Sequence, residues 1–132
     1  MILGCISTKH ICDIYACNFL NTNAFVKCYA SKSGMATFNE LIGSDKPVLV
    51  DFSAEWCGPC QAMPPILKQV KEMLGDGVTI LKVDIDKNPA TANAFRVQSV
   101  PTLILFKSGQ TKWRQSGVVS AAQLKAVIDK HL

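Results

Sequence analysis

The sequence of 132 residues lacks the features of several broad protein classes. No apolar run approaches the roughly 18 residues that a membrane-spanning helix needs, so we expect no membrane partner. The net charge of +4 is small, and the absence of basic runs with interleaved aromatic residues argues against nucleic-acid binding. No repeat or low-complexity segment is present. Because 48% of the residues are hydrophobic, we expect one globular domain with a sizeable core.

Cysteine is scarce in the body of the chain. Four of the six cysteines lie at positions 5, 12, 17 and 28, and only Cys57 and Cys60 lie beyond them. A secreted protein held together by disulfides would spread its cysteines through the whole domain. This distribution favours a reducing compartment, and we expect the protein to be cytoplasmic.

Residues 1–34 differ in composition from the rest of the chain. Because they contain few charges and no apolar period, we expect a poorly ordered extension before a domain that spans residues 35–132. Polar residues interrupt every candidate core of a secretory signal, so export or lipidation is only an alternative. A metal site of His10, Cys12, Cys17 and Cys28 is another alternative, although their spacing matches no standard zinc pattern. Residues 25–30 also suit a short edge strand.

The stretch from residue 48 to residue 60, VLVDFSAEWCGPC, predicts a buried strand that leads into a pair of cysteines. Gly58 and Pro59 between them suit a tight turn and the first turn of a helix. A thiol at the start of a helix lies near unpaired N–H groups and the positive end of the helix dipole. Both favour the thiolate, which is the nucleophile in dithiol–disulfide exchange. A zinc site is the alternative, but the folded region has no second cysteine pair, so we expect no metal.

The other elements follow from the apolar periodicity of the chain. The predicted helices cover residues 35–42, 59–74 (kinked by Pro64 and Pro65), 88–95 (capped by Asn88) and 120–132 (capped by Ser120), and the predicted strands cover residues 47–53, 78–84, 102–106 and 111–118. This order predicts an α/β fold in which parallel βαβ units precede a hairpin and a final helix. The mixed sheet has four strands, or five if residues 25–30 take part, with helices on both faces.

These residues together resemble a known family. The WCGPC sequence follows the VLVDF strand, and Val100-Pro101-Thr102 lies about forty residues downstream, a combination that closely resembles bacterial-type thioredoxin from about Phe38 to Leu132. The resemblance implies the thioredoxin fold and the activity of a protein-disulfide reductase. Such an electron carrier uses the Cys57–Cys60 dithiol–disulfide couple, binds no cofactor and is recycled by thioredoxin reductase with electrons from NADPH.

Two features depart from the usual family pattern. The family commonly begins with a strand before its first helix, and only residues 25–30 offer one here. The position after Phe52 is Ser53, where many bacterial members have a bulky aromatic residue and animal members have serine. The second change alters the packing near the dithiol more than its chemistry.

The resemblance assigns roles to the dithiol and to two charged residues. Cys57 is expected to be the nucleophile, and Cys60, expected to be more buried, resolves the mixed disulfide. From the pattern alone, Asp51 lies either in solvent at a strand end or buried with a raised pKa. The resemblance favours a buried acid/base that takes the proton from Cys60. Lys82, in the neighbouring strand, is expected to tune Asp51, unless its ammonium group simply lies in solvent.

Substrate binding is expected beside the dithiol. On sequence alone Pro101 is an ordinary loop proline, because only about 5–6% of X–Pro bonds are cis. The resemblance implies a cis bond before Pro101, which would leave neighbouring backbone groups free to pair with an extended substrate. Trp56 is expected on the surface, a core position being the alternative. At the surface it is expected to form an apolar docking patch together with Gly58, Pro59, Val100 and Gly117.

The Gly-Pro pair between the cysteines favours a reductant, because oxidising relatives typically carry histidine there. We therefore expect a monomeric reductase that acts on disulfide-containing client proteins. One alternative is an exported disulfide oxidase or isomerase, which would need a signal sequence. The other is a redox-independent binding subunit, whose activity would survive replacement of Cys57 and Cys60 by serine.

Overall fold

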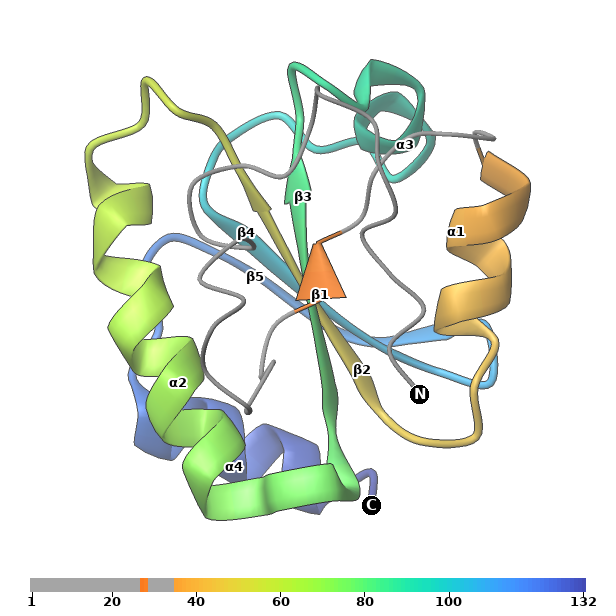
Figure 1. The fold of residues 1–132 in the computed structure, drawn as a ribbon, viewed down its shortest axis with the longest axis vertical. Helices are drawn as coiled ribbons and strands as arrows, with labels where there is room; N and C mark the ends of the chain where they lie inside the picture. Colours follow the sequence, from red (N-terminus) through yellow and green to blue (C-terminus); the bar gives the residue numbers. More distant parts are fainter. Residues whose placement is uncertain (1–26, 29–34) are drawn as a thin grey trace, which may run out of the picture.

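The computed structural model of the protein describes residues 27–28 and 35–132, which form a mixed five-stranded sheet (Figure 1). Its strands are β1 Lys27–Cys28, β2 Val48–Ser53, β3 Thr79–Asp84, β4 Thr102–Lys107 and β5 Gln110–Ser116, in the spatial order β1-β3-β2-β4-β5. Both β1 and β2 run parallel to β3, whereas β4 is antiparallel to β2 and β5 is antiparallel to β4. The predicted α/β fold is confirmed, and the sheet has the fifth strand that the sequence had left open.

The strand β1 falls within the range predicted as an extension. Its two residues pair with Leu81 and Lys82 of β3. The rest of residues 1–34 lies outside the described part of the chain. His10, Cys12 and Cys17, three of the four residues considered for a metal, fall in that part, whereas the fourth, Cys28, belongs to β1.

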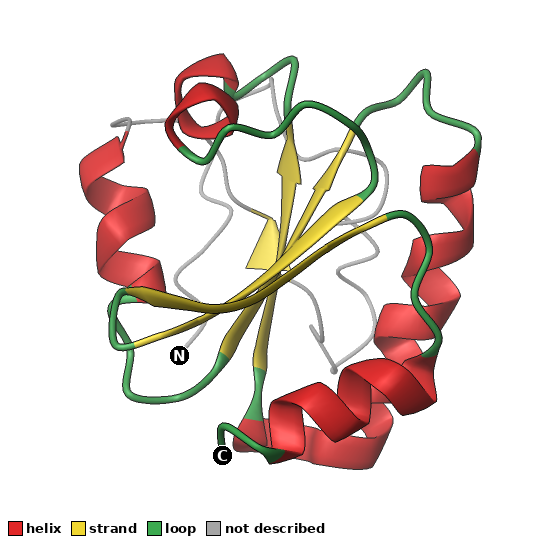
Figure 2. Cartoon of the chain, turned by 180° about the vertical axis from the view of Figure 1, so that it is seen from behind, coloured by secondary structure: helices red, strands yellow, loops and turns green. Residues whose placement is uncertain are grey.

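Helices cover both faces of the sheet, as the element order predicts. The helices α1 Met35–Ile42 and α3 Pro89–Ala94 lie on one face, and α2 Met63–Leu74 and α4 Ala121–Asp129 lie on the other (Figures 1 and 2). All six residues of β2 are buried, because this strand is central and covered on both sides. Within the described residues, no helix is long and apolar enough to span a membrane.

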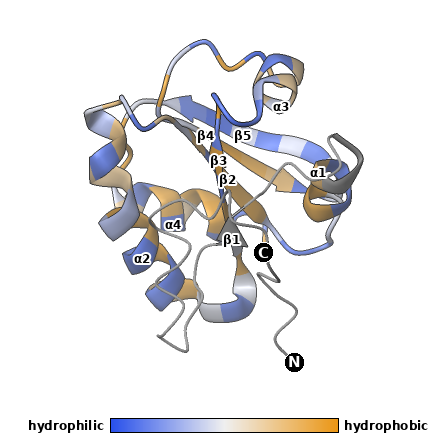
Figure 3. Cartoon of the chain, turned by 45° about the horizontal axis from the view of Figure 1, so that its top comes forward, coloured by the Kyte–Doolittle hydropathy of each residue, from blue (hydrophilic) through white to orange (hydrophobic). Residues whose placement is uncertain are grey.

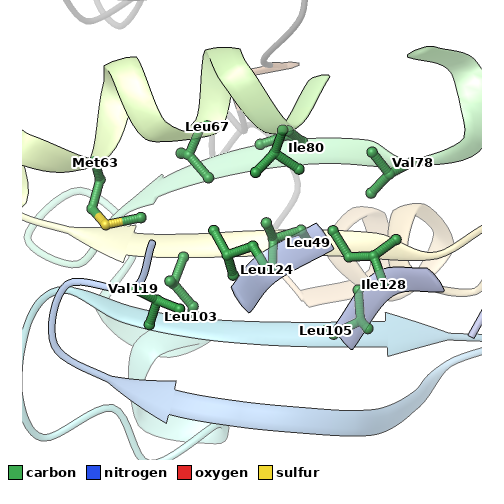
Figure 4. Close-up of a cluster of buried hydrophobic side chains, with 11 residues drawn as sticks. Leu49, Met63, Leu67, Val78, Ile80, Leu103, Leu105, Val119, Leu124 and Ile128 are labelled. Atoms are coloured by element: carbon green, nitrogen blue, oxygen red, sulfur yellow. The ribbon is translucent and has the colours of Figure 1, made fainter. Parts of the chain in front are cut away.

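The core between the sheet, α2 and α4 is aliphatic. Its buried side chains point toward one another from both helices, from β2, β3 and β4 and from the segments just before β3 and α4 (Figure 4). They are Leu49, Met63, Leu67, Val70, Val78, Ile80, Leu103, Leu105, Val119, Leu124 and Ile128. Burying a side chain of this size contributes about 1.5–3 kcal/mol, so the cluster is a main source of stability.

The core on the opposite face is aromatic. The ring of Phe95, just after α3, lies 5.3 Å from the ring of Phe38 and 5.2 Å from that of Phe106. Phe52 of β2 completes the group and is fully buried. These contacts attach the end of α3 to α1 and to the sheet.

The predicted helix over residues 59–74 is wrong in one respect, because two elements share that range. A 3₁₀ turn covers Pro59–Ala62, and the α-helix begins only at Met63. Pro64 and Pro65 therefore lie in the first turn of α2. A proline there loses no hydrogen bond, since the N–H groups of a first turn have no partner within the helix.

The two predicted helix caps had different outcomes. Ser120 caps α4 as expected, since its side chain accepts a hydrogen bond from the backbone N–H of Gln123 in a full capping box. Asn88 precedes α3, but its side chain caps nothing there and donates instead to the carbonyl of Asp84 at 3.0 Å. The local pattern identified the position but not this competing partner.

The strand β5 forms an edge of the sheet and differs from the central strands. Six of its seven residues are exposed and only Trp113 is half-buried, in agreement with its largely hydrophilic colouring in Figure 3. A register shift opposite Leu105 and Phe106 interrupts its pairing with β4. Charged residues and a bulge on an edge strand both discourage pairing with another chain.

The end of α3 is a Schellman turn with an unusual residue at its turning point. The N–H of Val97 donates to the carbonyl of Ala92, and the N–H of Arg96 donates to the carbonyl of Asn93. Arg96 has a φ of 50°, which is the left-handed region where glycine is the usual residue. This conformation costs an arginine on the order of 1 kcal/mol.

We therefore expect Arg96→Gly to raise the free energy of unfolding by about 0.5–1 kcal/mol, because relief of the left-handed strain outweighs the greater freedom of glycine in the unfolded chain. Urea unfolding at neutral pH measures the change. Arg96→Ala is the matched control, since it removes the same side chain but keeps the strain. Equal stability of the glycine and alanine variants would contradict this account.

Candidate active site

The two cysteines of the WCGPC sequence form a disulfide where β2 leaves the sheet. Their Cα atoms lie 5.4 Å apart. The N–H of Cys57 donates to the carbonyl of Ala54, which turns the chain toward the 3₁₀ segment that contains Cys60. Both cysteines are 5% exposed, so the prediction that Cys60 is the more buried one is wrong for this oxidised form.

Backbone groups distinguish the two sulfur atoms where burial does not. The N–H of Cys60 lies 3.2 Å from the Sγ of Cys57 and points at it. This sulfur also lies 3.5 Å from the carbonyl oxygen of Val100. After reduction, an N–H group aimed at Cys57 favours its thiolate form, because a hydrogen bond to the charged form lowers a pKa.

Asp51 is buried in the centre of the sheet. It is 1% exposed, and its register partners are Lys82 of β3 and Leu103 of β4. Burial raises the pKa of Asp51 from 3.8 to about 7, and the positive charge of Lys82 opposes part of that rise. Of the two alternatives left open by the sequence, the buried carboxyl with a raised pKa is therefore the one found.

The side chain of Asp51 lies on the α2 side of the sheet. Side chains alternate along β2, and Leu49 belongs to the cluster under α2, whereas Val50 and Phe52 belong to the cluster under α1. The same alternation puts Ser53 on the α2 side. One oxygen of Asp51 and the hydroxyl of Ser53 are buried without a protein partner.

Trp56 lies on the surface beside the dithiol, as predicted, with 69% of its area exposed. Its indole N–H donates to a carboxylate oxygen of Asp86 at 2.9 Å. The turn that holds Asp86 is fixed in turn by Asp84, whose carboxylate accepts the N–H of Asp86 and of Lys87. Lys87 also forms an ion pair with Glu55 at 3.1 Å. The sequence alone indicates no role for these four charged residues.

The bond between Val100 and Pro101 is cis, as the family resemblance implied. Its loop is held from two sides. The buried hydroxyl of Thr102 donates to the carbonyl of Ser99 at 2.6 Å, and the N–H of Gly117 donates to the carbonyl of Pro101 at 2.8 Å. Gly117 has a φ of 91°, which explains why glycine occupies this position.

The structure brings all ten predicted site residues to the dithiol end of the sheet or to the strands beneath it. Gly58 and Pro59, within the turn, are both exposed. A side chain at Gly58 would contact nothing within 4 Å, and its φ of −60° is ordinary, so neither space nor conformation requires glycine there. Among the described residues, no group of three potential metal ligands is present.

The site thus combines a disulfide at the start of a helical segment with a cis-proline loop, and the sequence that forms it matches the model of a known family. The family model named thioredoxin covers residues 28–130 of the sequence. The chain belongs to the thioredoxin family. Its activity is accordingly that of a thioredoxin, a dithiol–disulfide reductase with a redox-active disulfide and a role in electron transport.

Individual relatives agree with this assignment. The chain is 54% identical to the thioredoxin-like protein slr0233 of Synechocystis sp. over 96 residues, which are 72% of this chain and 91% of that protein. It is 47% identical to a thioredoxin of Alicyclobacillus acidocaldarius over 69% of this chain and 87% of the relative. It is 44% identical to thioredoxin Y, chloroplastic, of Oryza sativa over 83% of this chain. The chain spans only 60–66% of the length of three such chloroplastic relatives.

A solved structure extends the comparison to the fold. The N21Q mutant thioredoxin from Halobacterium salinarum superimposes with a TM-score of 0.71 at 31% identity, covering 80% of this chain and 89% of that one. The thioredoxin fold expected from the sequence is thereby confirmed.

The raised pKa of Asp51 makes stability depend on pH. Below pH 3.8 the carboxyl is protonated in the folded and unfolded states alike, and it does not affect their balance. As the pH rises toward 7 the unfolded state ionises first, which favours unfolding. Asp51→Asn removes this penalty, so we expect it to raise the free energy of unfolding relative to wild type more at high pH than at low pH. The increase at pH 8 should exceed the increase at pH 3.5 by about 4 kcal/mol.

Urea unfolding of the oxidised protein at the two pH values measures that difference. Glu72→Gln, which removes one negative charge from the exposed surface of α2, is the control. A gain for Asp51→Asn that is the same at both pH values would mean that Asp51 titrates normally.

Proposed function

We propose that Cys57 is the nucleophile of this reductase and Cys60 its resolving residue. The thiolate of Cys57 attacks a client disulfide, forms a mixed disulfide and expels the second client sulfur as a thiolate. Cys60 then gives up its proton and attacks the sulfur of Cys57. The Cys57–Cys60 disulfide closes and the first client sulfur leaves. Two electrons and two protons thus pass from the dithiol to the client.

The observation that carries this order is the N–H of Cys60 directed at the sulfur of Cys57. A donor aimed at one sulfur stabilises negative charge on that sulfur during attack. Cys57 also lies at the open end of the turn, between the exposed Trp56 and Gly58. A client sulfur can approach it there.

Asp51 is proposed to accept the proton of Cys60 in the second step. Its side chain lies on the α2 side of the sheet, and Cys60 belongs to the 3₁₀ turn that leads into α2. A carboxyl with a pKa of about 7 is matched to proton transfer near neutral pH. Lys82, its neighbour in β3, is proposed to tune it by favouring the carboxylate.

The docking site for clients is proposed to be a short apolar surface around the dithiol. An extended client segment would pair with the backbone beside the cis bond of Pro101, in the manner of an added strand. The surface consists of Trp56, Gly58, Pro59, Val100 and Gly117, which the sequence analysis had grouped together.

The wider setting of the reaction is also a proposal. Family membership implies reductase and client partners in general terms. We propose that thioredoxin reductase recycles the disulfide with electrons from NADPH, that no cofactor is bound, and that the protein is a monomer whose catalytic domain is residues 35–132 with β1 as an added edge strand. We propose a cytoplasmic location, and the names of the chloroplastic relatives make a plastid the alternative.

Reduction of insulin disulfides tests this function. With NADPH and a bacterial thioredoxin reductase, we expect steady turnover by wild type and loss of at least about 10³-fold in Cys57→Ser, because the nucleophile is gone. Cys60→Ser should instead accumulate a mixed disulfide with insulin, visible by mass spectrometry.

The controls separate the competing functions. In one control, dithiothreitol replaces the reductase and NADPH as the source of electrons. Turnover by the protein with dithiothreitol but not with the reductase and NADPH would indicate that the bacterial reductase does not recognise it. Absence of turnover under both conditions would contradict a reductase and favour the binding-subunit alternative.

A further inference from the structure

A contact that the exchange mechanism does not use connects the edge strand β5 to the loop of the cis-proline. Arg114 of β5 donates one hydrogen bond to the carbonyl of Phe95 at 2.7 Å and one to the carbonyl of Arg96 at 2.8 Å. The two donors are the two terminal nitrogens of one guanidinium group. Arg114 thus joins residues eighteen and nineteen positions earlier in the chain.

The two carbonyls are among those that the internal bonds of the Schellman turn do not use. The internal bonds of the turn use the carbonyls of Thr91, Ala92 and Asn93. Those of Phe95 and Arg96 come after them, at the negative end of the α3 dipole. A guanidinium group suits this place, because its fork of donors can bind two carbonyls at once and its charge complements the dipole.

The same contact holds a strained conformation. Arg96 has a positive φ, and a residue other than glycine leaves that region unless its surroundings fix it. Packing of Phe95 against Phe38 and Phe106 fixes the residue before it. Arg114 binds the carbonyl of Arg96 itself, and so sets the direction in which the chain leaves α3.

That direction leads to the dithiol within four residues. Val100 follows Arg96 by four positions, and its carbonyl lies 3.5 Å from the sulfur of Cys57. The loop between them is tied at its far end by Thr102, through Ser99. At its near end, the side chain of Arg114 in β5 connects the loop to the sheet through its hydrogen bond to the carbonyl of Arg96.

We propose that Arg114 is a positioning residue that holds the Val100 backbone in place for pairing with extended peptide substrates. The proposal rests on the proposed reductase function and on strand-like docking beside Pro101. It makes a specific distinction between substrates. A peptide disulfide needs the loop backbone in register, whereas a small aromatic disulfide needs only an accessible Cys57.

The test compares three variants with wild type. Arg114→Ala removes both donors, and Arg114→Lys keeps the charge but loses the fork that reaches two carbonyls. Lys112→Ala is the matched control. It removes a cation of the same strand that donates a hydrogen bond to the side chain of Gln110 and not to the loop.

Kinetics with dithiothreitol as reductant give the first readout. For Arg114→Ala we expect KM for insulin to rise roughly fivefold with little change in kcat, which is the size expected from losing charged but exposed hydrogen bonds. Arg114→Lys should recover only part of the loss. The second-order rate constant for reaction of the reduced protein with the small disulfide 5,5′-dithiobis(2-nitrobenzoate) should stay at the wild-type value in every variant. Lys112→Ala should also keep the wild-type KM and kcat for insulin.

Amide hydrogen exchange of the oxidised protein gives a second readout that does not depend on activity. In Arg114→Ala the N–H of Val97, which closes the Schellman turn, should exchange at least about fivefold faster. The N–H of Leu124 in α4 should be unchanged, because a local loosening leaves the other face of the sheet intact.

The outcomes are distinct. Wild-type insulin kinetics in Arg114→Ala would overturn the positioning role while leaving the reductase function in place. Equal losses with insulin and with the small disulfide, or faster exchange at Leu124 as well as Val97, would also overturn it, because they indicate general destabilisation. Absence of insulin reduction by wild type, with Cys57→Ser no different, would refute the reductase function itself and the substrate distinction with it.

Discussion

The register of β2 between β3 and β4 is the constraint on which the site depends. It places Asp51 beside Lys82 on one side and Leu103 on the other, and it delivers the chain to Cys57 at the end of the sheet. A slip of one residue would exchange the two faces of β2. Asp51 would then point into the aromatic core, and Phe52 would point toward α2. The apolar residues that alternate along β2 therefore fix both the fold and the position of the buried carboxyl that we propose as the proton acceptor.

At Asp51, the burial that suits the carboxyl to proton transfer also lowers the stability of the folded protein. Burial of Asp51 raises its pKa to about 7, and the same burial favours unfolding at neutral pH. The two cores on either side of the sheet offset that cost. Similar local costs occur at Arg96, which adopts a left-handed conformation, and at the buried hydroxyl of Ser53, which has no protein partner. All three lie in β2 or in the segment that leads to Pro101, so unfavourable features concentrate near the site.

Much of this could be predicted from the sequence, because the signals are local. The apolar run of β2 and the capping residue Ser120 define elements through their neighbours in the chain, and the WCGPC sequence with its distant Val-Pro-Thr identified the family. Long-range contacts escaped prediction. Asp86 binds Trp56 from thirty residues away, and Arg114 binds Phe95 from nineteen. The equal burial of Cys57 and Cys60 also depends on how separate loops pack, which no spacing in the sequence reveals.

The proposed transfer of the Cys60 proton to Asp51 can be observed in the reaction of the reduced protein with one equivalent of 5,5′-dithiobis(2-nitrobenzoate). The first thiolate released reports attack by Cys57, and the second reports attack by Cys60 on the mixed disulfide. We predict that the second step follows a group with a pKa near 7 in wild type and is at least about tenfold slower in Asp51→Asn at pH 7, with the first step little changed. Identical rates for the second step in both proteins from pH 6 to 9 would show that Asp51 does not accept this proton.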